Sequence, residues 1–453
     1  MSMRQLLAFS ILAFFCLYFF SSGLSTGTSN FLWHGLTATT SEQPYRAPGF
    51  PDFGRYAPPR TLSGDEFPIR SFAIDCEQLT ALTPWLDDPH KRIIIVGDVH
   101  GMDKPLHALF DKLSYDPSSD VLLHVGDIIA KGPHDGSLAV IDYMAAHNVT
   151  GVRGNHDQKV IEWRAWLDWI NGLDGGAPWL ADFHRKWSAA APADPEAWAE
   201  KHLRKAKTEW ARRIPKGWKL LGDHYRVAAA LSDAQFAYLL ALPLVLHAPA
   251  AHAYIAHAGV LPSDPRYAPA HRRQPLARVP TLPKGATHDR AHPNATLPLL
   301  RRLQEAAVLT DVPQNTDPWV TLNMRGVLPD KSVTRAKNGE PWSDVWNHDV
   351  SLCAGFDQHI HLTKHSKNAL PCYPATVVYG HAASRGLDVK RWTVGLDSGC
   401  VYEKRLSSLV LEPQSASFED DNDEHDDAEA YKKKHVIPFG DSGRARIVSV
   451  KCK

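Results

Sequence analysis

Short apolar segments, each ending at polar residues, alternate with helical patterns along the first part of the chain. They are, in order, a strand over 93–96, a helix over 103–113, a strand over 121–125, a helix over 138–146, and a strand with its exit loop over 151–156. The first strands are rich in Val, Ile and Leu, as is typical of strands buried on both faces. Strands and helices alternating at this spacing predict right-handed crossovers and therefore an α/β domain.

A tryptophan-rich stretch interrupts this alternation between residues 158 and 245. It holds eight of the chain's 14 tryptophans, separated by many Lys, Arg and Ala residues. We interpret it as a helical insertion whose tryptophans form its own core and dock it to the main domain. A platform on which bases stack is the alternative. Strand patterns return over 251–261, 375–379 and 391–412, and a last edge strand is predicted over 445–452.

Composition divides the chain into segments. These are a short N-terminus over 1–5, an apolar segment over 6–24, a Pro-, Gly- and Ser-rich lead-in over 25–88, the folded domain over 89–412 with its insertion over 158–245, an acidic disordered loop over 413–435, and a C-terminal edge strand over 436–453. The acidic loop carries eight acids between Glu419 and Glu429, a density typical of disordered surface segments.

The apolar segment over 6–24 follows Arg4 and precedes a polar stretch. Nineteen residues at about 1.5 Å each cover roughly 28 Å, enough for the core of a bilayer. Because the positive charges precede the segment, we predict a signal anchor with a cytosolic N-terminus and a lumenal domain. A cleaved signal peptide is the alternative, since Ser21, Ser22 and Gly23 are small residues near its end. The protein would then be secreted or lumenal.

The overall charge excludes one class of partner. The formal net charge is zero, so no global basic field attracts nucleic acid, and no nucleic-acid partner is expected. Hydrophobic residues make up 44% of the chain and charged residues 22%, as in globular proteins. The 24 histidines leave room for a metal site.

Cysteines and sequons bear on the compartment. Five cysteines lie outside the apolar segment, so at most two disulfides can form within one chain. Cys353 with Cys372 is the first pair to test, and unpaired buried thiols are the alternative. Asn148-Val149-Thr150 and Asn294-Ala295-Thr296 are glycosylation sequons, the second in a Pro-rich stretch.

Polar motifs follow five of the predicted strands. In chain order they are Gly97-Asp98-Val99-His100-Gly101, Gly126-Asp127, Gly154-Asn155-His156-Asp157, His257 and Gly380-His381. The carboxyl ends of strands form the ligand-binding edge of an α/β sheet, and glycines let the backbone approach a ligand closely. Two carboxylates, an amide oxygen and three imidazoles at one edge form a mixed N/O donor set suited to Zn, Mn or Fe.

This ordered series resembles the calcineurin-like metallophosphoesterases over residues 90–412. The resemblance implies a layered β-sheet sandwich flanked by helices, together with two divalent metal ions (Zn, Mn, Co or Fe). It assigns Asp98 and His100 to the first metal, Asp127 to a bridge between both, and Asn155, His257 and His381 to the second. It also implies that hydroxide activated by the two metals attacks phosphorus while His156 acts as general acid or stabilises the leaving group.

Closer similarities refine the resemblance. Residues 257–260 (His-Ala-Gly-Val) and 395–402 (Gly-Leu-Asp-Ser-Gly-Cys-Val-Tyr) resemble the branch that contains bacterial symmetrical diadenosine tetraphosphatases and serine/threonine phosphatases. The N-terminal anchor, Asn323-Met324-Arg325 and the run Pro-Trp-Ser-Asp-Val-Trp over 341–346 are most similar to the fungal vacuolar metal-dependent endopolyphosphatases.

The second motif departs from the Gly-Asp-x-Val-Asp-Arg-Gly pattern of protein phosphatases in this branch. Ala130 stands where a carboxylate normally orients the catalytic histidine, so Asp157 or another group takes that role, or His156 is less strongly supported. Lys131 replaces the arginine and keeps its charge with less geometric demand. The candidates for binding phosphate are Lys131, Arg153, Arg325 and Arg385.

The sequence therefore predicts a metal-dependent hydrolase of phosphate esters or anhydrides. By resemblance it is an endopolyphosphatase that cleaves inorganic polyphosphate in a vacuole-like lumen, anchored in the vacuole membrane, with the Lys/Arg-rich stretch 200–217 as a further source of positive charge. A serine/threonine protein phosphatase or a bis(5'-nucleosyl)-tetraphosphatase is the alternative. A non-catalytic binding protein is disfavoured, because every proposed ligand is present.

Overall fold

The computed structural model describes residues 91–206, 208–283, 296–356, 369–412 and 436–453. The predicted membrane span, the lead-in and the acidic loop all lie outside these residues, as do Asn294 and Ala295 of the second sequon. Within the described ranges, no helix combines the length and the apolarity that a membrane crossing requires.

Six strands form the first sheet, in the spatial order β13-β14-β12-β1-β2-β3. Their bounds are β1 (Arg92–Val96), β2 (Asp120–His124), β3 (Thr150–Gly151), β12 (Arg405–Leu411), β13 (Val436–Phe439) and β14 (Gly443–Lys451). The strands β1, β2 and β3 are parallel, and β12, β14 and β13 extend the sheet antiparallel from β1. The helices α2 (Asp103–Leu113) and α3 (His134–Ala146) connect the parallel strands, which confirms the predicted alternation.

Five strands form the second sheet, in the order β10-β11-β9-β5-β4. Their bounds are β4 (Val245–Ala248), β5 (Ala253–Ala256), β9 (Thr376–Tyr379), β10 (Asp388–Lys390) and β11 (Thr393–Gly395). Here β5, β9 and β11 are parallel neighbours, whereas β4 and β10 pair antiparallel at the two edges. A small third sheet, β7-β6-β8, contains β6 (Gly326–Val327), β7 (Val333–Thr334) and β8 (Glu340–Pro341).

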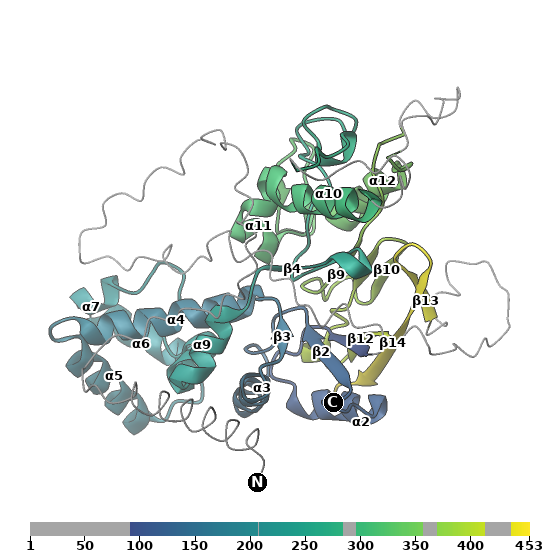
Figure 1. Ribbon diagram of the computed structural model, residues 1–453. Helices are drawn as coiled ribbons and strands as arrows, with labels where there is room; N and C mark the ends of the chain where they lie inside the picture. The colour runs from purple at the N-terminus through teal and green to yellow at the C-terminus, as the bar shows by residue number, and fades with distance from the viewer. Residues whose placement is uncertain (1–90, 207, 284–295, 357–368, 413–435) are drawn as a thin grey trace, which may run out of the picture. The chain divides into compact units, whose positions relative to one another are not determined.

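The two large sheets pack face to face between helical layers. Because side chains alternate across a strand, Ile93 and Ile95 of β1 enter the core between the sheets, while Ile94 and Val96 pack against helices. Figure 1 shows α2 and α3 beside the first sheet, and α10 (Leu297–Asp311), α11 (Pro318–Asn323) and α12 (Trp342–Ser351) beside the second. The predicted layered arrangement of sheets flanked by helices is confirmed.

The spacing of apolar residues explains how α2 covers the sheet. Leu106, Leu109, Phe110 and Leu113 recur at intervals of three and four residues, so they share one face, and all are buried. The helix ends at Ser114, whose left-handed backbone lets its N–H bond to the carbonyls of Asp111 and Phe110.

The predicted insertion is helical. It contains α4 (Asn155–Gly172), α5 (Gly176–Ala190), α6 (Pro195–Ala206), α7 (Glu209–Arg212), α8 (Asp223–Ala230) and α9 (Asp233–Ala241). Trp163 and Trp166 of α4 are buried and pack edge to face, and Trp218 lies against Trp163 with ring centroids 4.6 Å apart. These tryptophans belong to the core of the insertion rather than to an exposed stacking surface.

Three features refine the expectations from the sequence. Cys353 forms a disulfide with Cys372, the pair that the sequence analysis put first for testing. A second disulfide joins Cys400 and Cys452. The third strand is short, Thr150–Gly151, and Asn155 and His156 lie in α4 rather than in an exit loop. The C-terminal segment is a hairpin: β13 occupies the edge of the sheet, and β14 lies inside it, between β13 and β12.

Candidate metal centre

The predicted ligands lie where strands of both large sheets end. Asp98 follows β1, Asp127 follows β2, and Asn155 begins α4 four residues after the end of β3. His257 follows β5 and His381 follows β9 in the second sheet. The backbone N–H of His381 donates to both carboxylate oxygens of Asp98 at 3.2 and 3.0 Å, across 283 residues of sequence. The sandwich thus brings two ligand-binding edges together.

Two glycines allow this close approach. A Cβ added to Gly380 would lie 2.1 Å from Oδ1 of Asp98, and one added to Gly154 would lie 2.1 Å from both the backbone N and the Oδ1 of Asp127. The ligand loops themselves are strained, because His100, Asp127 and His381 have positive φ angles of 49°, 51° and 69°. Strain of this kind persists only where the surrounding structure over-determines it, and it concentrates at functional sites.

The carboxylate of Asp157 holds the Asp127 loop in place. Its two oxygens accept the backbone N–H groups of Asp127, Ile128 and Ile129, at 2.8, 3.1 and 3.4 Å, and that of Gly154 at 2.9 Å. Asp157 is fully buried. The sequence left open whether Asp157 orients His156; its carboxylate is instead occupied by these four backbone groups.

Donor atoms of the predicted ligands converge in a buried cluster. Ligand atoms of Asp98, Asp127 and His257 all lie within 4.8 Å of one another. Nε2 of His257 is 3.4 Å from Oδ2 of Asp127 and 3.0 Å from Oδ1 of Asn155. Nε2 of His100 is 3.5 Å from the same Asp127 oxygen, and Nδ1 of His381 is 2.9 Å from Oδ1 of Asn155.

The hydrogen bonds of the two later histidines show which nitrogens carry lone pairs. Nδ1 of His257 lies 2.9 Å from the carbonyl of Val125, and Nε2 of His381 lies 3.2 Å from the carbonyl of Asn323. A carbonyl only accepts, so in each neutral ring that nitrogen carries the hydrogen and the other one carries a lone pair. The lone pairs then face the oxygens of Asp127 and Asn155. Acceptors that face one another without a proton between them require a cation, so the cluster fits a divalent metal ion.

The charges of the cluster are mutually coupled. Burial, together with Asp397 and Asp127, raises the pKa of Asp98 well above its usual range. Burial also raises the pKa of Asp127, but the imidazoles of His257, His156 and His100 outweigh it and hold that pKa well below its usual range. Burial lowers the pKa of His257, yet the neighbouring Asp127 raises it on balance.

Asp397 belongs to this cluster although the sequence did not single it out. It is 5% exposed, and burial raises its pKa, with a further contribution from Asp127. Its backbone position, two residues after the end of β11, was a usable signal, because Asp98 and His381 stand at the same distance from their own strands.

His156 lies beside the cluster and has a histidine partner. Its backbone N–H donates to Oδ1 of Asp127 at 2.8 Å, and its ring meets that of His100 edge to face. Nδ1 of His156 is 2.8 Å from Nε2 of His224, a residue of α8 in the insertion. Burial lowers the pKa of His156 to about 2 and that of His224 to about 4. His224 was not expected from the sequence.

The four predicted phosphate-binding cations differ in their surroundings. Arg325 donates to the carbonyl of His381 at 3.2 Å, and Arg385 donates to the carbonyl of Arg325 at 2.5 Å, so both lie next to the ligand cluster. The exposed Lys131 extends over the ring of Tyr402, with Nζ 5.1 Å from its centroid. Arg153 is 1% exposed, and its guanidinium donates to Gln158 and to the carbonyl of Leu240. This burial favours a structural role for Arg153.

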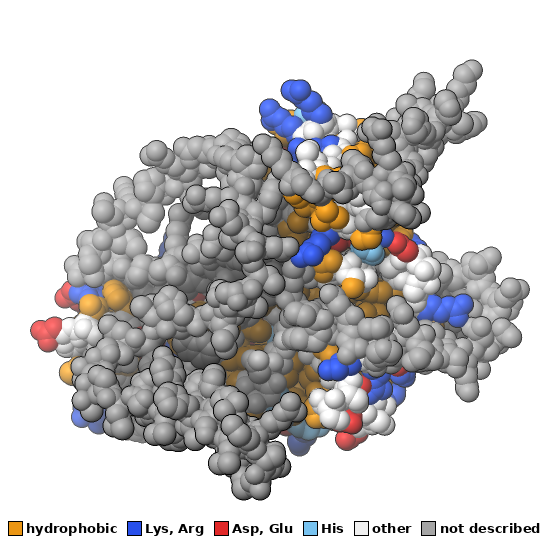
Figure 2. All heavy atoms as spheres, viewed as in Figure 1, with side chains coloured by type: hydrophobic (Ala, Val, Ile, Leu, Met, Phe, Trp, Pro, Cys, Tyr) orange, Lys and Arg blue, Asp and Glu red, His pale blue; other side chains and the backbone are white. Residues whose placement is uncertain are grey.

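Other surface cations lie away from the ligand loops in sequence. On α6 and α7, Arg204 pairs with Glu200 and Arg213 with Glu209, which neutralises part of the charge of the stretch 200–217. Figure 2 shows a second group of Lys and Arg side chains at the top of the view, over the loop that precedes α10. The exposed arginines of that loop include Arg266, Arg272, Arg273 and Arg278.

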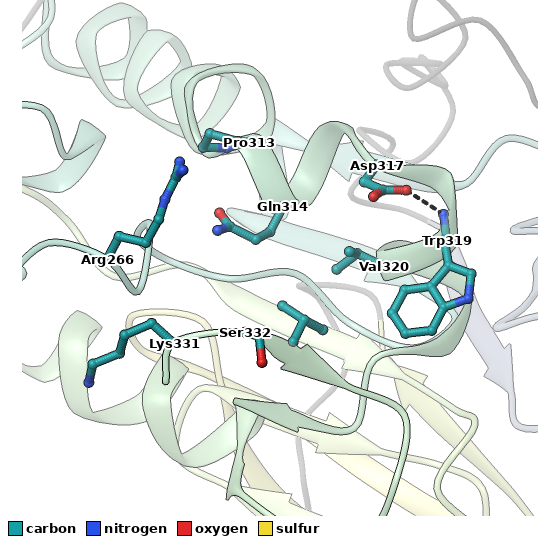
Figure 3. A pocket seen from close by; sticks show the side chains of 9 residues that line it. Arg266, Pro313, Gln314, Asp317, Trp319, Val320, Lys331 and Ser332 are labelled. Carbon is teal, nitrogen blue, oxygen red and sulfur yellow. Dashed lines mark hydrogen bonds between the residues drawn. The ribbon is translucent and has the colours of Figure 1, made fainter. Parts of the chain in front are cut away.

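An open pocket of about 430 Å³ lies between α11 and the turn that joins β6 to β7 (Figure 3). It is lined by Arg266, Pro313, Gln314, Asp317, Trp319, Val320, Lys331, Ser332 and Val333. None of the predicted metal ligands lines it. Of its two cations, Arg266 is paired with Asp264 through three hydrogen bonds, and Lys331 shares the lining with the acidic Asp317, which leaves little net charge for an anionic ligand.

Comparison with known proteins finds a similarity to one family over part of the chain. Residues 91–230 match the calcineurin-like phosphoesterases, a range that includes Asp98, Asp127 and Asn155. The chain is 32% identical over 103 residues to serine/threonine-protein phosphatase 1 of Salmonella typhimurium, covering 23% of this chain and 47% of that protein. It is 34% identical over 95 residues to serine/threonine-protein phosphatase 2 of Escherichia coli, covering 21% and 43%.

A second kind of relative matches a shorter region. The chain is 45% identical over 69 residues to the symmetrical bis(5'-nucleosyl)-tetraphosphatase of Klebsiella pneumoniae, covering 15% of this chain and 24% of that protein. The chain thus spans less than half the length of each of these curated relatives. Residues 91–230 are thus similar to the calcineurin-like phosphoesterases, and the wider assignment of the chain is a proposal.

Proposed function

We propose that the protein is a hydrolase of phosphoric esters or anhydrides that uses a binuclear metal centre. The observation that carries this proposal is the group of facing acceptors, in which lone pairs of His257 and His381 point at the oxygens of Asp127 and Asn155. Asp98, His100 and Asp127 would hold one ion, and Asp127, Asn155, His257 and His381 the other. Asp397 is close enough to influence the charge of the first site.

Divalent ions bound there would supply an acidified water and positive charge for the phosphoryl oxygens. Residues of the chain would neutralise the remaining phosphate charge and supply the proton for the leaving group. Lys131 and Arg325 would offset the remaining negative charge of the phosphoryl group, because both carry charges that act on the buried carboxylates. His156 would hold a proton at its second ring nitrogen, Nε2, and give it to the leaving oxygen or stabilise the charge there.

We propose inorganic polyphosphate as the substrate, cleaved within the chain in a vacuole-like lumen. The resemblance to fungal vacuolar endopolyphosphatases supports this, as do exposed cations such as Lys131 and Arg272. Two disulfides are consistent with an oxidising compartment beyond a membrane. The N-terminal apolar segment would anchor the protein in the vacuole membrane, or release it into the lumen if cleaved. Asn148 of the first sequon is exposed and open to glycosylation.

A phosphoprotein or a dinucleoside polyphosphate is the second candidate substrate. The observation that favours it is the similarity to serine/threonine phosphatases and to a symmetrical bis(5'-nucleosyl)-tetraphosphatase. Ala130 in place of the usual carboxylate weakens the protein-phosphatase version of this candidate.

Chain-length analysis tests the proposal. The purified protein is incubated with long-chain polyphosphate and Zn²⁺, Co²⁺, Mn²⁺ or Mg²⁺, and the products are separated by size on a gel. We expect progressive shortening through intermediate sizes, abolished by a chelator and by Asp127→Asn. Intact polymer together with metal-dependent hydrolysis of an aryl phosphate would move the substrate to phosphoproteins or dinucleotides. Inactivity on all of these substrates would overturn the hydrolase proposal.

A further inference from the structure

The helical insertion reaches the loop that carries Asp127. The backbone N–H of Lys131, four residues after Asp127, donates to the carboxylate of Asp223 at the start of α8. Tyr225 anchors α8 to the insertion: it is 1% exposed and packs edge to face on Trp163, with ring centroids 5.1 Å apart. The hydroxyl of Tyr225 is also 2.6 Å from Nε2 of His184 in α5. The tryptophan core therefore sets the position of the first turn of α8.

His224 is the residue that this turn presents to the metal centre. Its Nε2 lies 2.8 Å from Nδ1 of His156. The two rings are nearly parallel, with an interplanar angle of 18° and centroids 5.0 Å apart. His156 is in turn tied to Asp127 through its backbone N–H, so His224 contacts the proposed general acid and not a proposed ligand.

We propose that His224 is a positioning residue that orients His156 and fixes its tautomer for proton donation to the leaving group. This inference rests on the proposed hydrolase function and adds a residue from outside the strand-end motifs. Ala130 provides no side-chain acceptor in the loop after β2, and Nε2 of His224 lies within hydrogen-bond distance of Nδ1 of His156.

The hydrogen bond defines the route of the proton. With the Nδ1–H of His156 donating to the lone pair of Nε2 in His224, the proton that His156 exchanges is the one on its own Nε2. For this step His156 starts as the imidazolium, with a hydrogen on each ring nitrogen. On leaving-group departure, the Nε2–H bond breaks, the proton bonds to the leaving oxygen, and His156 becomes neutral with its Nδ1–H still held by His224. Positioning of this kind contributes to the general-acid step alone.

The alternative is that His224 only packs α8 against the domain. The two roles differ in how a mutation affects substrates with different leaving groups. A leaving group that is a strong acid departs without protonation, whereas a weakly acidic one needs the proton. Loss of positioning should therefore slow phenyl phosphate much more than 2,4-dinitrophenyl phosphate. A packing defect or loss of metal should slow both equally.

The test compares His224→Ala with wild type on a series of aryl phosphates, at saturating Mn²⁺ and with the bound metal measured. We expect kcat for phenyl phosphate to fall by roughly 10- to 100-fold, within the range of a general-acid contribution. For 2,4-dinitrophenyl phosphate we expect less than about a 3-fold loss, with KM little changed for either ester. His224→Gln, whose amide oxygen accepts the same hydrogen bond, should recover most of the loss.

Two further variants keep the test independent of folding. His184→Ala removes another histidine of the insertion that bonds to Tyr225 but not to His156, and it should leave the dependence on leaving group as in wild type. Combining His156→Ala with His224→Ala should cost no more than His156→Ala alone, because the two residues act as one unit.

A uniform loss across leaving groups, a loss of metal in His224→Ala, or additive losses in the double variant would overturn the inference while leaving the hydrolase function intact. Wild-type protein without activity on any aryl phosphate or polyphosphate would overturn the proposed function itself.

Discussion

At the scale of single residues, the two oxygens of Asp127 make different contacts. Oδ1 accepts the backbone N–H of His156, whereas Oδ2 faces His100 and His257. In Asp127→Asn, the amide keeps the size of the side chain and the acceptor for His156, but it loses the negative charge. We expect kcat to fall by more than about 100-fold, since even the outer partners of metal ligands are worth roughly 10- to 100-fold.

The folded state should tolerate this change. Circular dichroism and the thermal midpoint of the chelated protein should match those of chelated wild type within a few degrees. Near-normal turnover with verified metal content would contradict the role of Asp127 as a bridging ligand. Loss of structure would instead show that the charge of Asp127 is needed for folding.

Gly380 tests the requirement for close packing at the ligands. In Gly380→Ala the new Cβ would lie 2.1 Å from Oδ1 of Asp98, so the Asp98 carboxylate must move. We expect metal affinity to fall by roughly 10-fold or more, measured by titration with Mn²⁺. Gly172→Ala is the matched control, because nothing lies within 4 Å of the added Cβ at the end of α4. Equal metal affinity in both variants would contradict the packing argument.

How far the site could be predicted depends on which residues local sequence can place. Asp98, Asp127 and His257 follow strands that the apolar runs reveal, and the fold brings them together. Asp397 stands in the same relation to β11 and could have been found by the same rule. His224 could not, because it lies in the first turn of a helix that does not directly follow a strand, and its approach to His156 depends on the packing of the insertion.

At the scale of elements, the start of α4 differs from the prediction made from the sequence pattern. The sequence analysis placed Asn155 and His156 in the exit loop of a strand, but both are helical. The helix begins there because Asp157, its third residue, accepts the backbone N–H of Gly154 just before it. The run Gly-Asn-His-Asp therefore contains both a helix-capping residue, Asp157, and a predicted metal ligand, Asn155.

The disulfide Cys400–Cys452 is an element-scale test of stability. It ties η8 (Cys400–Tyr402), just after Asp397, to the residue that follows β14, across a sequence separation of 52. Longer loops lose more entropy on closure, and removing such a bridge costs about 2–5 kcal/mol. We expect Cys400→Ala/Cys452→Ala to lower the free energy of unfolding by that amount in guanidinium titrations without reductant.

The reducing agent provides the control for this variant. Dithiothreitol reduces both disulfides, so the comparison is made in proteins that already lack Cys353–Cys372. In that background, the protein that keeps Cys400 and Cys452 should, in dithiothreitol, approach the stability of the one that carries Cys400→Ala/Cys452→Ala. The Cys353–Cys372 bridge closes a sequence separation of 19, so its own removal should cost less. Equal stability of the double variant and wild type would show that β13 and β14 hold the C-terminus without the bridge.

At the scale of the whole molecule, the sandwich explains why distant motifs meet. The parallel strands of the first sheet deliver Asp98 and Asp127, and those of the second deliver His257 and His381. Alternating apolar runs and crossovers were enough to predict an α/β domain, whereas the layered sandwich was expected only from the family resemblance. They could not predict the pairing of β14 between β12 and β13, because strand order at an antiparallel edge depends on long-range contacts rather than on local pattern.

The same convergence places three buried carboxylates together, and this has a consequence for the stability of the metal-free protein. The pKa of Asp98 is raised by burial and by Asp397 and Asp127, so its charged form is disfavoured in the folded state. A carboxyl with a raised folded pKa contributes stability below its unfolded pKa, near 3.9. That contribution is lost as the pH rises through the folded pKa. In a chelator, Asp98→Asn should therefore be more stable than wild type at pH 7–8, and the difference should shrink toward pH 4.

Metal should reverse this order, because it converts the repulsion among Asp98, Asp127 and Asp397 into binding. At 100 times its dissociation constant, a bound ion contributes about 2.7 kcal/mol to stability, so Mn²⁺ should raise the thermal midpoint of wild type well above that of Asp98→Asn at pH 7. Thermal unfolding of both proteins across this pH range, with chelator and with Mn²⁺, measures both effects. If chelated Asp98→Asn were less stable than chelated wild type at every pH, the prediction would be wrong. The carboxylate of Asp98 would then stabilise the metal-free fold through its hydrogen bonds with the backbone N–H of His381.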